Sequence, residues 1–309
     1  MRVYYADHYE VPLPPGHRFP MEKYALLRAA LIDRGILRLR SAPGQAPDEL
    51  CPADPAPLAA VALAHTSDYL DGVINGTLSA KLVRGLGFPW SPQLVQRSLA
   101  SVGGTIAAAK SALEGGSGIA GNLAGGTHHA FADRGEGFCV FNDLAVTTRL
   151  LLRDKQVRRV LILDLDVHQG NGTAAILRDD PGAFTCSLHG ERNYPFHKEA
   201  SHLDVGLPDG CGDDEYLTRL QPSLGEALSR ANPDLILYQA GVDALKGDRL
   251  GRLSLTHAGL RQRDRLVLTA ARTRGVPIAL TLGGGYASPI TATVEAYVGT
   301  YAVAKELYG

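Results

Sequence analysis

The chain has 309 residues, enough to bury a large core, and its composition, 45% hydrophobic and 20% charged, is typical of a soluble globular enzyme. A net charge of -1 provides no basic field, which argues against nucleic acid or an anionic membrane surface as a partner. No apolar run is long enough to span a bilayer, the N-terminus lacks the apolar core of a signal peptide, and the four scattered cysteines indicate neither a disulfide framework nor a cysteine zinc site. We therefore expect a cytoplasmic protein whose residues 1–309 form one domain.

Short aliphatic strands alternate with amphipathic helices along the chain. Six strands are predicted, at residues 2–6, 119–123, 184–188, 235–239 and 277–282 and in the run that begins at residue 160. Helices are predicted to begin near residues 21 and 58 and to cover residues 93–113, 141–153, 213–230, 256–274 and 290–307. Residues 41–57 and 204–212 are expected to be loops. The alternation predicts an α/β fold with a single parallel sheet and helices on both faces.

One stretch organises the rest of the chain: residues 160–172, VLILDLDVHQGNG. Its aliphatic start is typical of a strand that is buried on both faces. Asp164, Asp166 and His168 then occupy every second position, so an extended backbone points their side chains the same way. Burying these groups is costly unless a cation pairs with them, which predicts a divalent metal here. Taken alone, the motif could instead be an ion pair between aspartate and histidine that caps the strand.

Polar or glycine-rich clusters end four of the predicted strands. They are His128-His129, the group from Asp164 to His168, Asp243 and, after three glycines, Tyr286. Each cluster alone is more often structural than functional. The carboxyl ends of strands in an open parallel sheet form one ligand-binding edge, so these residues are expected to converge on one site.

Asp166, His168 and Asp243 would give a metal two oxygen ligands and one nitrogen, with a position left open. Three protein ligands and an open position are typical of catalytic zinc, although Fe(II) or Mn(II) would also accept this donor set. The open position would take a water, whose pKa the metal lowers, and a substrate oxygen.

The other residues at this edge have complementary chemistry. His128 and His129 suit the proton transfers that hydrolysis requires. The phenol of Tyr286 is a hydrogen-bond donor for a developing oxyanion. Asp164 can orient one of the histidines. Together these groups predict metal-assisted hydrolysis of an amide.

Six motifs occur in order along nearly the whole chain. They are GTHHA at 126–130, GFCVFND at 137–143, DLDVHQGNG at 164–172, GVDAL at 241–245, GDRLG at 247–251 and GGGY at 283–286. In this combination the chain resembles the histone deacetylase superfamily. Residues 168–172 read HQGNG where class I members have HHGDG, which is similar to class IV or a related bacterial branch.

The resemblance implies an arginase/deacetylase fold, with a parallel sheet of about eight strands. It implies Zn²⁺ on Asp166, His168 and Asp243. It also implies a structural K⁺, held largely by main-chain carbonyls, at a site that matches Asp164, Asp166, His168, Ser187 and Leu188.

Further residue roles follow from the same resemblance. His129 would act as general base and then acid, and His128, held by Asp164, would be its electrostatic or proton-donating partner. Tyr286 would polarise the acyl carbonyl. The remaining positions line an acyl-lysine tunnel and its rim: Gly137, Phe138 and Leu250.

Two departures from the family pattern concern the site. Asn171 occupies the position of the class I aspartate behind the second histidine, and an amide stabilises a charged imidazole less than a carboxylate does. No residue matches the aspartate at the rim of class I members; Trp90 either shapes the rim or packs against the protein. The second tunnel wall is expected from residues 193–196, with the aromatic that forms it left open.

The resulting functional prediction is zinc-dependent removal of an acyl group from lysine in a protein or peptide. An acetylpolyamine or other small-molecule amidohydrolase is the alternative, but residues 85–92 provide no acidic cluster for a cationic substrate. A ureohydrolase would need an aspartate where Gly170 stands. A non-catalytic binder of acyl-lysine is less expected because Tyr286, the metal ligands and the tunnel glycine are all present. The sequence predicts neither the acyl length nor an oligomeric state.

Overall fold

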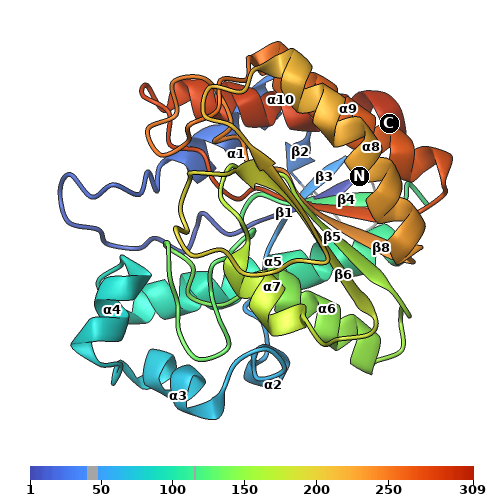
Figure 1. Cartoon of the computed structure of the whole chain (residues 1–309). Helices are drawn as coiled ribbons and strands as arrows, with labels where there is room; N and C mark the ends of the chain where they lie inside the picture. Colours follow the sequence, from blue (N-terminus) through green and yellow to red (C-terminus); the bar gives the residue numbers. More distant parts are fainter. Residues whose placement is uncertain (40–47, 115) are drawn as a thin grey trace.

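The computed structural model describes residues 1–39, 48–114 and 116–309 (Figure 1). Its centre is a nine-stranded sheet, ordered β2-β3-β1-β4-β9-β8-β5-β6-β7, in which all paired strands are parallel. The strands are Arg2–Tyr5 (β1), Arg38–Leu39 (β2), Glu49–Pro52 (β3), Ile119–Asn122 (β4), Val160–Asp164 (β5), Ala183–Gly190 (β6), Leu203–Leu207 (β7), Leu235–Gln239 (β8) and Ile278–Thr281 (β9). The predicted single parallel sheet is therefore confirmed.

Three strands were not predicted, and all lie at or beside the edges of the sheet. β2 and β7 are the edge strands, and β3 lies next to β2. β3 falls in residues 41–57, which were wrongly expected to be a loop; residues 41–47 of that range lie outside the described part of the chain. β7 also replaces a predicted loop, because LDVGL lies at an edge where one face stays exposed and polar residues are tolerated.

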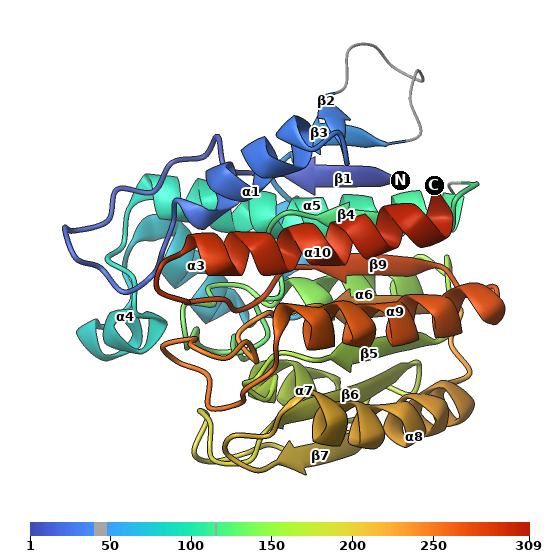
Figure 2. The ribbon, with the colours of Figure 1, turned by 90° about the horizontal axis from the view of Figure 1, so that it is seen from above.

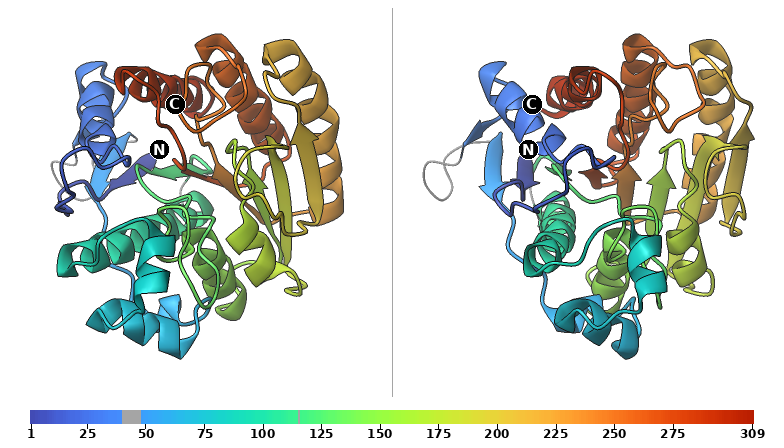
Figure 3. Two further views of the ribbon diagram at one scale, coloured as in Figure 1. Left: turned by 60° about the vertical axis from the view of Figure 1, so that its left-hand side comes forward. Right: turned by 90° about the vertical axis from the view of Figure 1, so that its left-hand side faces the viewer.

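Helices cover both faces of the sheet (Figures 1 and 3). One face carries Lys23–Asp33 (α1), Asp213–Ala231 (α8), His257–Thr273 (α9) and Thr291–Tyr308 (α10). The other carries Leu58–Val61 (α2), Ser67–Asn75 (α3), Ala80–Leu86 (α4), Pro92–Glu114 (α5), Asp143–Arg153 (α6) and Asn171–Leu177 (α7). The strands contribute apolar side chains to both layers, which explains their continuous aliphatic sequences. Within the described residues, none of the helices combines the length and apolarity needed to cross a membrane.

The predicted helix boundaries agree closely except in three places, the first being α4, which was not predicted. The helix expected from residue 58 is divided into α2 and α3, because Thr66 accepts a hydrogen bond from the Tyr69 backbone N–H at 3.4 Å and begins α3 as its N-cap. The short helix α7 was missed, since it starts directly after a glycine-rich turn.

The sheet order places the predicted site motifs side by side. β4, β9, β8 and β5 are consecutive neighbours in the sheet although they are far apart in the chain. Their carboxyl ends lead to His128-His129, Tyr286, Asp243 and the Asp166–His168 segment. Both termini lie at the opposite end of the molecule (Figure 2). The four motifs therefore share one edge, as the strand pattern predicts.

Candidate active site

A buried cluster of three possible metal ligands lies beyond the ends of β5 and β8. His168 Nδ1 is 3.0 Å from Asp166 Oδ1 and 3.0 Å from Asp243 Oδ2, and the candidate ligand atoms of the three residues all lie within 4.8 Å of one another. Burial lowers the pKa of His168, but hydrogen bonds to Asp166 and Asp243 outweigh it and raise this pKa to about 10. The carboxylates of Asp166 and Asp243 therefore favour a positive charge between the three groups. A divalent metal would supply that charge and take the neutral imidazole and the two carboxylates as ligands.

Backbone groups hold the two carboxylates in place. The N–H of Gly284 donates to Asp166 Oδ2 at 2.7 Å, and the N–H of Val167 donates to Asp243 Oδ1 at 2.9 Å. A Cβ atom on Gly284 would overlap the Asp243 carboxylate, so this close approach requires glycine in the GGGY motif.

A buried arginine that the sequence did not reveal supports the same loops. Arg263 of α9 is fully buried and pairs with Asp264 at 2.8 Å. Its guanidinium donates to the carbonyl oxygens of Leu165 at 3.3 Å and of Gly241 at 2.5 Å. These carbonyls precede the metal-ligand candidates by one and two residues. Arg263 thus links the two segments that present them.

The two predicted catalytic histidines have different electrostatic environments. His128 Nδ1 lies 2.7 Å from Asp164 Oδ2; burial alone would lower the pKa of His128, but the charges of Asp164 and Asp166 raise it. His129 Nδ1 lies 2.7 Å from Asn171 Oδ1, and burial together with His128 and His168 lowers the pKa of His129 well below its usual range. Because Asn171 Oδ1 only accepts, Nδ1 of His129 carries the hydrogen and Nε2 is the basic nitrogen.

Tyr286 is fixed by its own backbone. Its N–H donates to Asp248 Oδ2 at 2.6 Å, and its carbonyl accepts from Arg249 Nε at 2.9 Å. Burial raises the pKa of Tyr286 far above its usual value, so the phenol keeps its proton. Lys23 Nζ lies 5.0 Å from the ring centroid. The side chain is thus a fixed hydrogen-bond donor.

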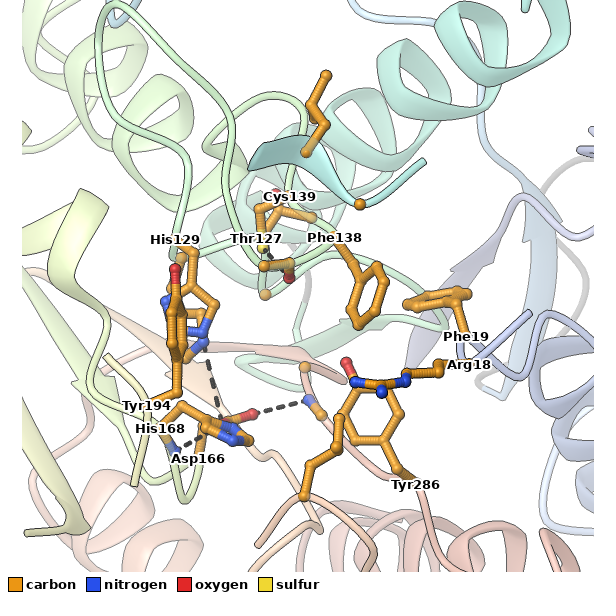
Figure 4. A pocket seen from close by; sticks show the side chains of 18 of the residues that line it. Arg18, Phe19, Thr127, His129, Phe138, Cys139, Asp166, His168, Tyr194 and Tyr286 are labelled. Carbon is orange, nitrogen blue, oxygen red and sulfur yellow. Dashed lines mark hydrogen bonds and ion pairs between the residues drawn. The ribbon is translucent and has the colours of Figure 1, made fainter. Parts of the chain in front are cut away.

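These groups surround a cavity of about 520 Å³ with aromatic walls. His129 and Tyr194 lie on one side, and Phe138 and Phe19 lie on the other (Figure 4). The Tyr194 ring meets the His129 ring edge-on at 5.0 Å, and its hydroxyl donates to Glu136 Oε2 at 2.9 Å. Tyr194 is therefore the wall-forming aromatic of residues 193–196.

Two consecutive residues with positive φ, Gly137 and Phe138, shape the part of the cavity between His129 and the Phe138 wall. Gly137 has φ 55°, and a Cβ atom there would lie 2.6 Å from the His129 ring. Phe138 also has a positive φ, 66°, a conformation that non-glycine residues rarely adopt and that often occurs at functional sites. This backbone directs Phe138 into the cavity.

The structure places most of the predicted site residues in the cavity lining, namely His128, His129, Gly137, Phe138, Asp166, His168, Leu250 and Tyr286. Asp164 and Asn171 contact the two histidines from behind, and Asp243 contacts His168. Ser187 pairs with Asp164 in the β5–β6 register, and Leu188 follows it. Trp90 is not in the lining; its Nε1 donates to the Val73 carbonyl at 2.8 Å, so it packs against α3.

Sequence reasoning missed the part of the lining that comes from before α1 and from the end of α4. Arg18 and Phe19 lie in a loop, and residues 85–87 form the carboxyl end and C-cap of α4; neither segment follows a strand, and only tertiary contacts bring them to the mouth. Phe196 also lies at the mouth, with 79% of its surface exposed.

A buried Asp-His-Asp cluster beside a histidine pair and a phenol, at the carboxyl edge of a parallel sheet, defines a class of metal-dependent hydrolases. The family model of the histone deacetylase domain matches residues 17–301. The chain therefore belongs to the histone deacetylase family, whose members are generally metal-dependent hydrolases that remove acetyl groups by cleaving amide bonds.

Individual relatives agree with this assignment. An uncharacterised protein of Picosynechococcus sp. is 45% identical over 99% of this chain and 98% of its own length. Histone deacetylase 2 of Arabidopsis thaliana is 36% identical over 72% of this chain and 59% of its own length. The crystal structure of a histone deacetylase homologue in complex with SAHA has a TM-score of 0.81 and 25% identity, covering 99% of this chain and 84% of the other. The predicted arginase/deacetylase fold is thereby confirmed, with nine strands rather than about eight.

Proposed function

We propose that the chain is a zinc-dependent lysine deacylase, formed by a single domain of residues 1–309, that hydrolyses N-ε-acyl-lysine in a protein or peptide to lysine and a carboxylate. One observation carries the proposal: a basic nitrogen on His129 and a protonated phenol on Tyr286 face the same aromatic-walled cavity beside the Asp-His-Asp cluster. A flat aromatic passage suits the four methylenes of a lysine side chain, and it excludes water from the reacting amide.

The residues would divide the chemistry as follows. Asp166, His168 and Asp243 would hold Zn²⁺, or Fe²⁺, which supplies a polarised carbonyl and an acidified water when bound. His129 Nε2 would take the proton of that water and later pass a proton to the leaving amine. Tyr286 would donate a hydrogen bond to the carbonyl oxygen as negative charge develops on it.

Other groups would support these steps. Asp164 and Asp166 raise the pKa of His128, and a positive charge on His128 favours the neutral form of His129. Asn171 fixes the tautomer of His129. A structural K⁺ on the carbonyls around Asp164, Ser187 and neighbouring residues would hold the ends of β5 and β6 together.

Lysine is favoured over a polyamine because of the mouth of the cavity. Among the described lining residues, the only carboxylate is that of Asp166, in the metal cluster itself. A cationic acetylpolyamine would therefore meet no counter-charge at the entrance. A non-catalytic acyl-lysine binder would not need the tautomer control that Asn171 provides. A cytoplasmic location is part of the proposal.

The test is deacylation by the zinc-loaded protein of ε-acyl-lysine peptides, from acetyl to myristoyl, and of acetylpolyamines. We expect peptide turnover that Tyr286→Phe lowers by at least about 100-fold without loss of bound zinc, since it removes one oxyanion donor. His129→Ala should abolish turnover, and Tyr308→Phe, at a phenol far from the cavity that donates to Leu268, should have no effect. Turnover of polyamines alone would favour the alternative substrate. Zinc bound without any turnover would contradict the enzymatic proposal.

A further inference from the structure

An unpaired guanidinium lies at the mouth of the cavity. Arg18 lines the cavity near Tyr286 and is exposed (Figure 4). It has no hydrogen-bond or ion-pair partner among residues 1–39, 48–114 and 116–309. A guanidinium is always charged and offers five N–H donors, so this cation is available to a ligand.

The residues on either side of Arg18 fix its position. His17 Nε2 bonds the carbonyl of Gly87 at 2.9 Å, and His17 Nδ1 accepts from the Phe19 N–H at 3.2 Å. The Phe19 ring packs against Phe88 at 5.0 Å and Phe138 at 5.3 Å. Because both neighbours are held by the walls of the cavity, Arg18 is presented at its entrance and does not move freely with a loop.

The acidic groups near the mouth are already engaged. Glu136 accepts from Arg134 Nε at 2.7 Å and from the Tyr194 hydroxyl at 2.9 Å. Asp248 accepts from the N–H groups of Leu250, Gly251 and Tyr286. Neither carboxylate contacts Arg18, so among the described residues the guanidinium at the entrance is left for an anionic group of a substrate.

We propose that Arg18 is a specificity-determining residue that binds a carboxylate of the substrate at, or next to, the α-carbon of the acyl-lysine. This inference rests on the proposed function, in which the acyl group lies toward the metal cluster and the lysine side chain fills the aromatic passage. The α-carbon then lies at the mouth, within the region that Arg18 borders. The carboxylate has two possible sources: the α-carboxylate of a C-terminal acyl-lysine, or the side chain of a neighbouring acidic residue.

Matched substrate pairs test the inference and separate the two sources. One pair is a peptide ending in acetyl-lysine with a free α-carboxylate and the same peptide as its C-terminal amide. The other pair has Glu or Gln next to an internal acetyl-lysine. We expect the zinc-loaded protein to prefer the acidic member of at least one pair by about fivefold in kcat/KM, the size expected for an exposed ion pair, and this preference should shrink at high salt.

Three variants assign the preference to Arg18. Arg18→Gln should bring the ratio close to one by lowering kcat/KM for the acidic member more than for the neutral one, and Arg18→Lys should retain part of the preference. Arg2→Gln removes the same charge at the amino end of β1, far from the cavity, and should keep the full ratio. Calorimetric binding of the same pairs to the zinc-loaded protein provides a readout that does not require turnover.

The outcomes are distinguishable. Turnover of acidic and neutral members at equal rates, or a preference that survives Arg18→Gln, would overturn the role of Arg18 and leave the deacylase proposal intact. If the zinc-loaded protein neither binds nor turns over any acyl-lysine compound, the proposed function is overturned and this inference with it.

Discussion

Asn171 shows how one side chain sets the chemistry of the site. Its oxygen lies 2.7 Å from His129 Nδ1, where it fixes the tautomer without contributing a charge. Burial and the neighbouring His128 and His168 already lower the pKa of His129. Because the Asn171 amide adds no charge, His129 remains a weak base that is unprotonated at neutral pH. A carboxylate at position 171 would produce a different base in the same geometry.

We predict that Asn171→Asp shifts the pH dependence of catalysis. The new carboxylate would stabilise the imidazolium and raise the pKa of His129, so the acidic limb of kcat/KM should move to higher pH by about one pH unit. The pH–rate profile on an acetyl-lysine peptide measures this. Asn171→Ala serves as the control, since it removes the acceptor without adding charge and should lower the rate without moving the limb upward. An acidic limb that stays in place in Asn171→Asp would show that His129 does not control it.

At the scale of elements, burial decided what could be predicted from the sequence. β4, β5, β8 and β9 are buried on both faces, so their aliphatic runs were visible and the polar residues after them stood out. The edge strand β7 and the short strands β2 and β3 lack that signal. The predicted site residues lie close together because the carboxyl ends of strands in one parallel sheet share an edge.

The residues that were missed depend on tertiary contacts. In sequence, Arg263 is one of several charged residues of an amphipathic helix, and such residues are usually solvated. The structure instead buries it completely beneath the metal-ligand loops, together with Asp264. Arg18 is equally inconspicuous in its loop, and only the packing of Phe19 against Phe138 brings it to the cavity. No local pattern distinguishes the buried Arg263, or an Arg18 that lines a cavity, from the other arginines of the chain.

We predict that Arg263→Met destabilises the fold and weakens metal binding. The substitution removes donors to the Leu165 and Gly241 carbonyls and leaves the buried Asp264 without its cation, which should cost about 3–5 kcal/mol of unfolding free energy. Urea unfolding with and without zinc, and zinc affinity by competition with a chelator, measure the two effects. Arg265→Met, on the same helix but exposed and paired with Glu306, should cost no more than about 1 kcal/mol. Equal losses in the two variants would contradict the role assigned to Arg263.

At the scale of the whole molecule, hydrogen bonds connect a remote turn to the two histidines that we propose to be catalytic. His65 lies between α2 and α3, and its Nε2 accepts from the N–H of Asn142 at 2.9 Å. Asn142 caps α6, and the next residue, Asp143, accepts from the N–H groups of Gly126 at 3.0 Å and Thr127 at 2.8 Å. Thr127 immediately precedes His128. The helical layer thus fixes the loop that carries His128 and His129, and this connection requires an unprotonated His65.

The last prediction concerns stability in acid. Burial lowers the pKa of His65 to about 4, whereas the unfolded chain has the ordinary value of about 6.5. Between these values the unfolded state binds more protons, so stability falls as pH decreases from about 6.5 to about 4 and is unaffected by this group at higher pH. Between pH 7.5 and pH 5, His65 should account for a loss of about 2 kcal/mol of unfolding free energy. In His65→Gln, where an amide oxygen can accept the same Asn142 hydrogen bond without titrating, the loss over this interval should be smaller than in the wild type by that amount. Urea unfolding of both proteins at the two pH values measures the difference. The other titrating groups contribute equally to the pH dependence of both proteins. Identical losses of unfolding free energy would therefore show that the connection from α2 to the loop of His128 and His129 does not depend on a neutral His65.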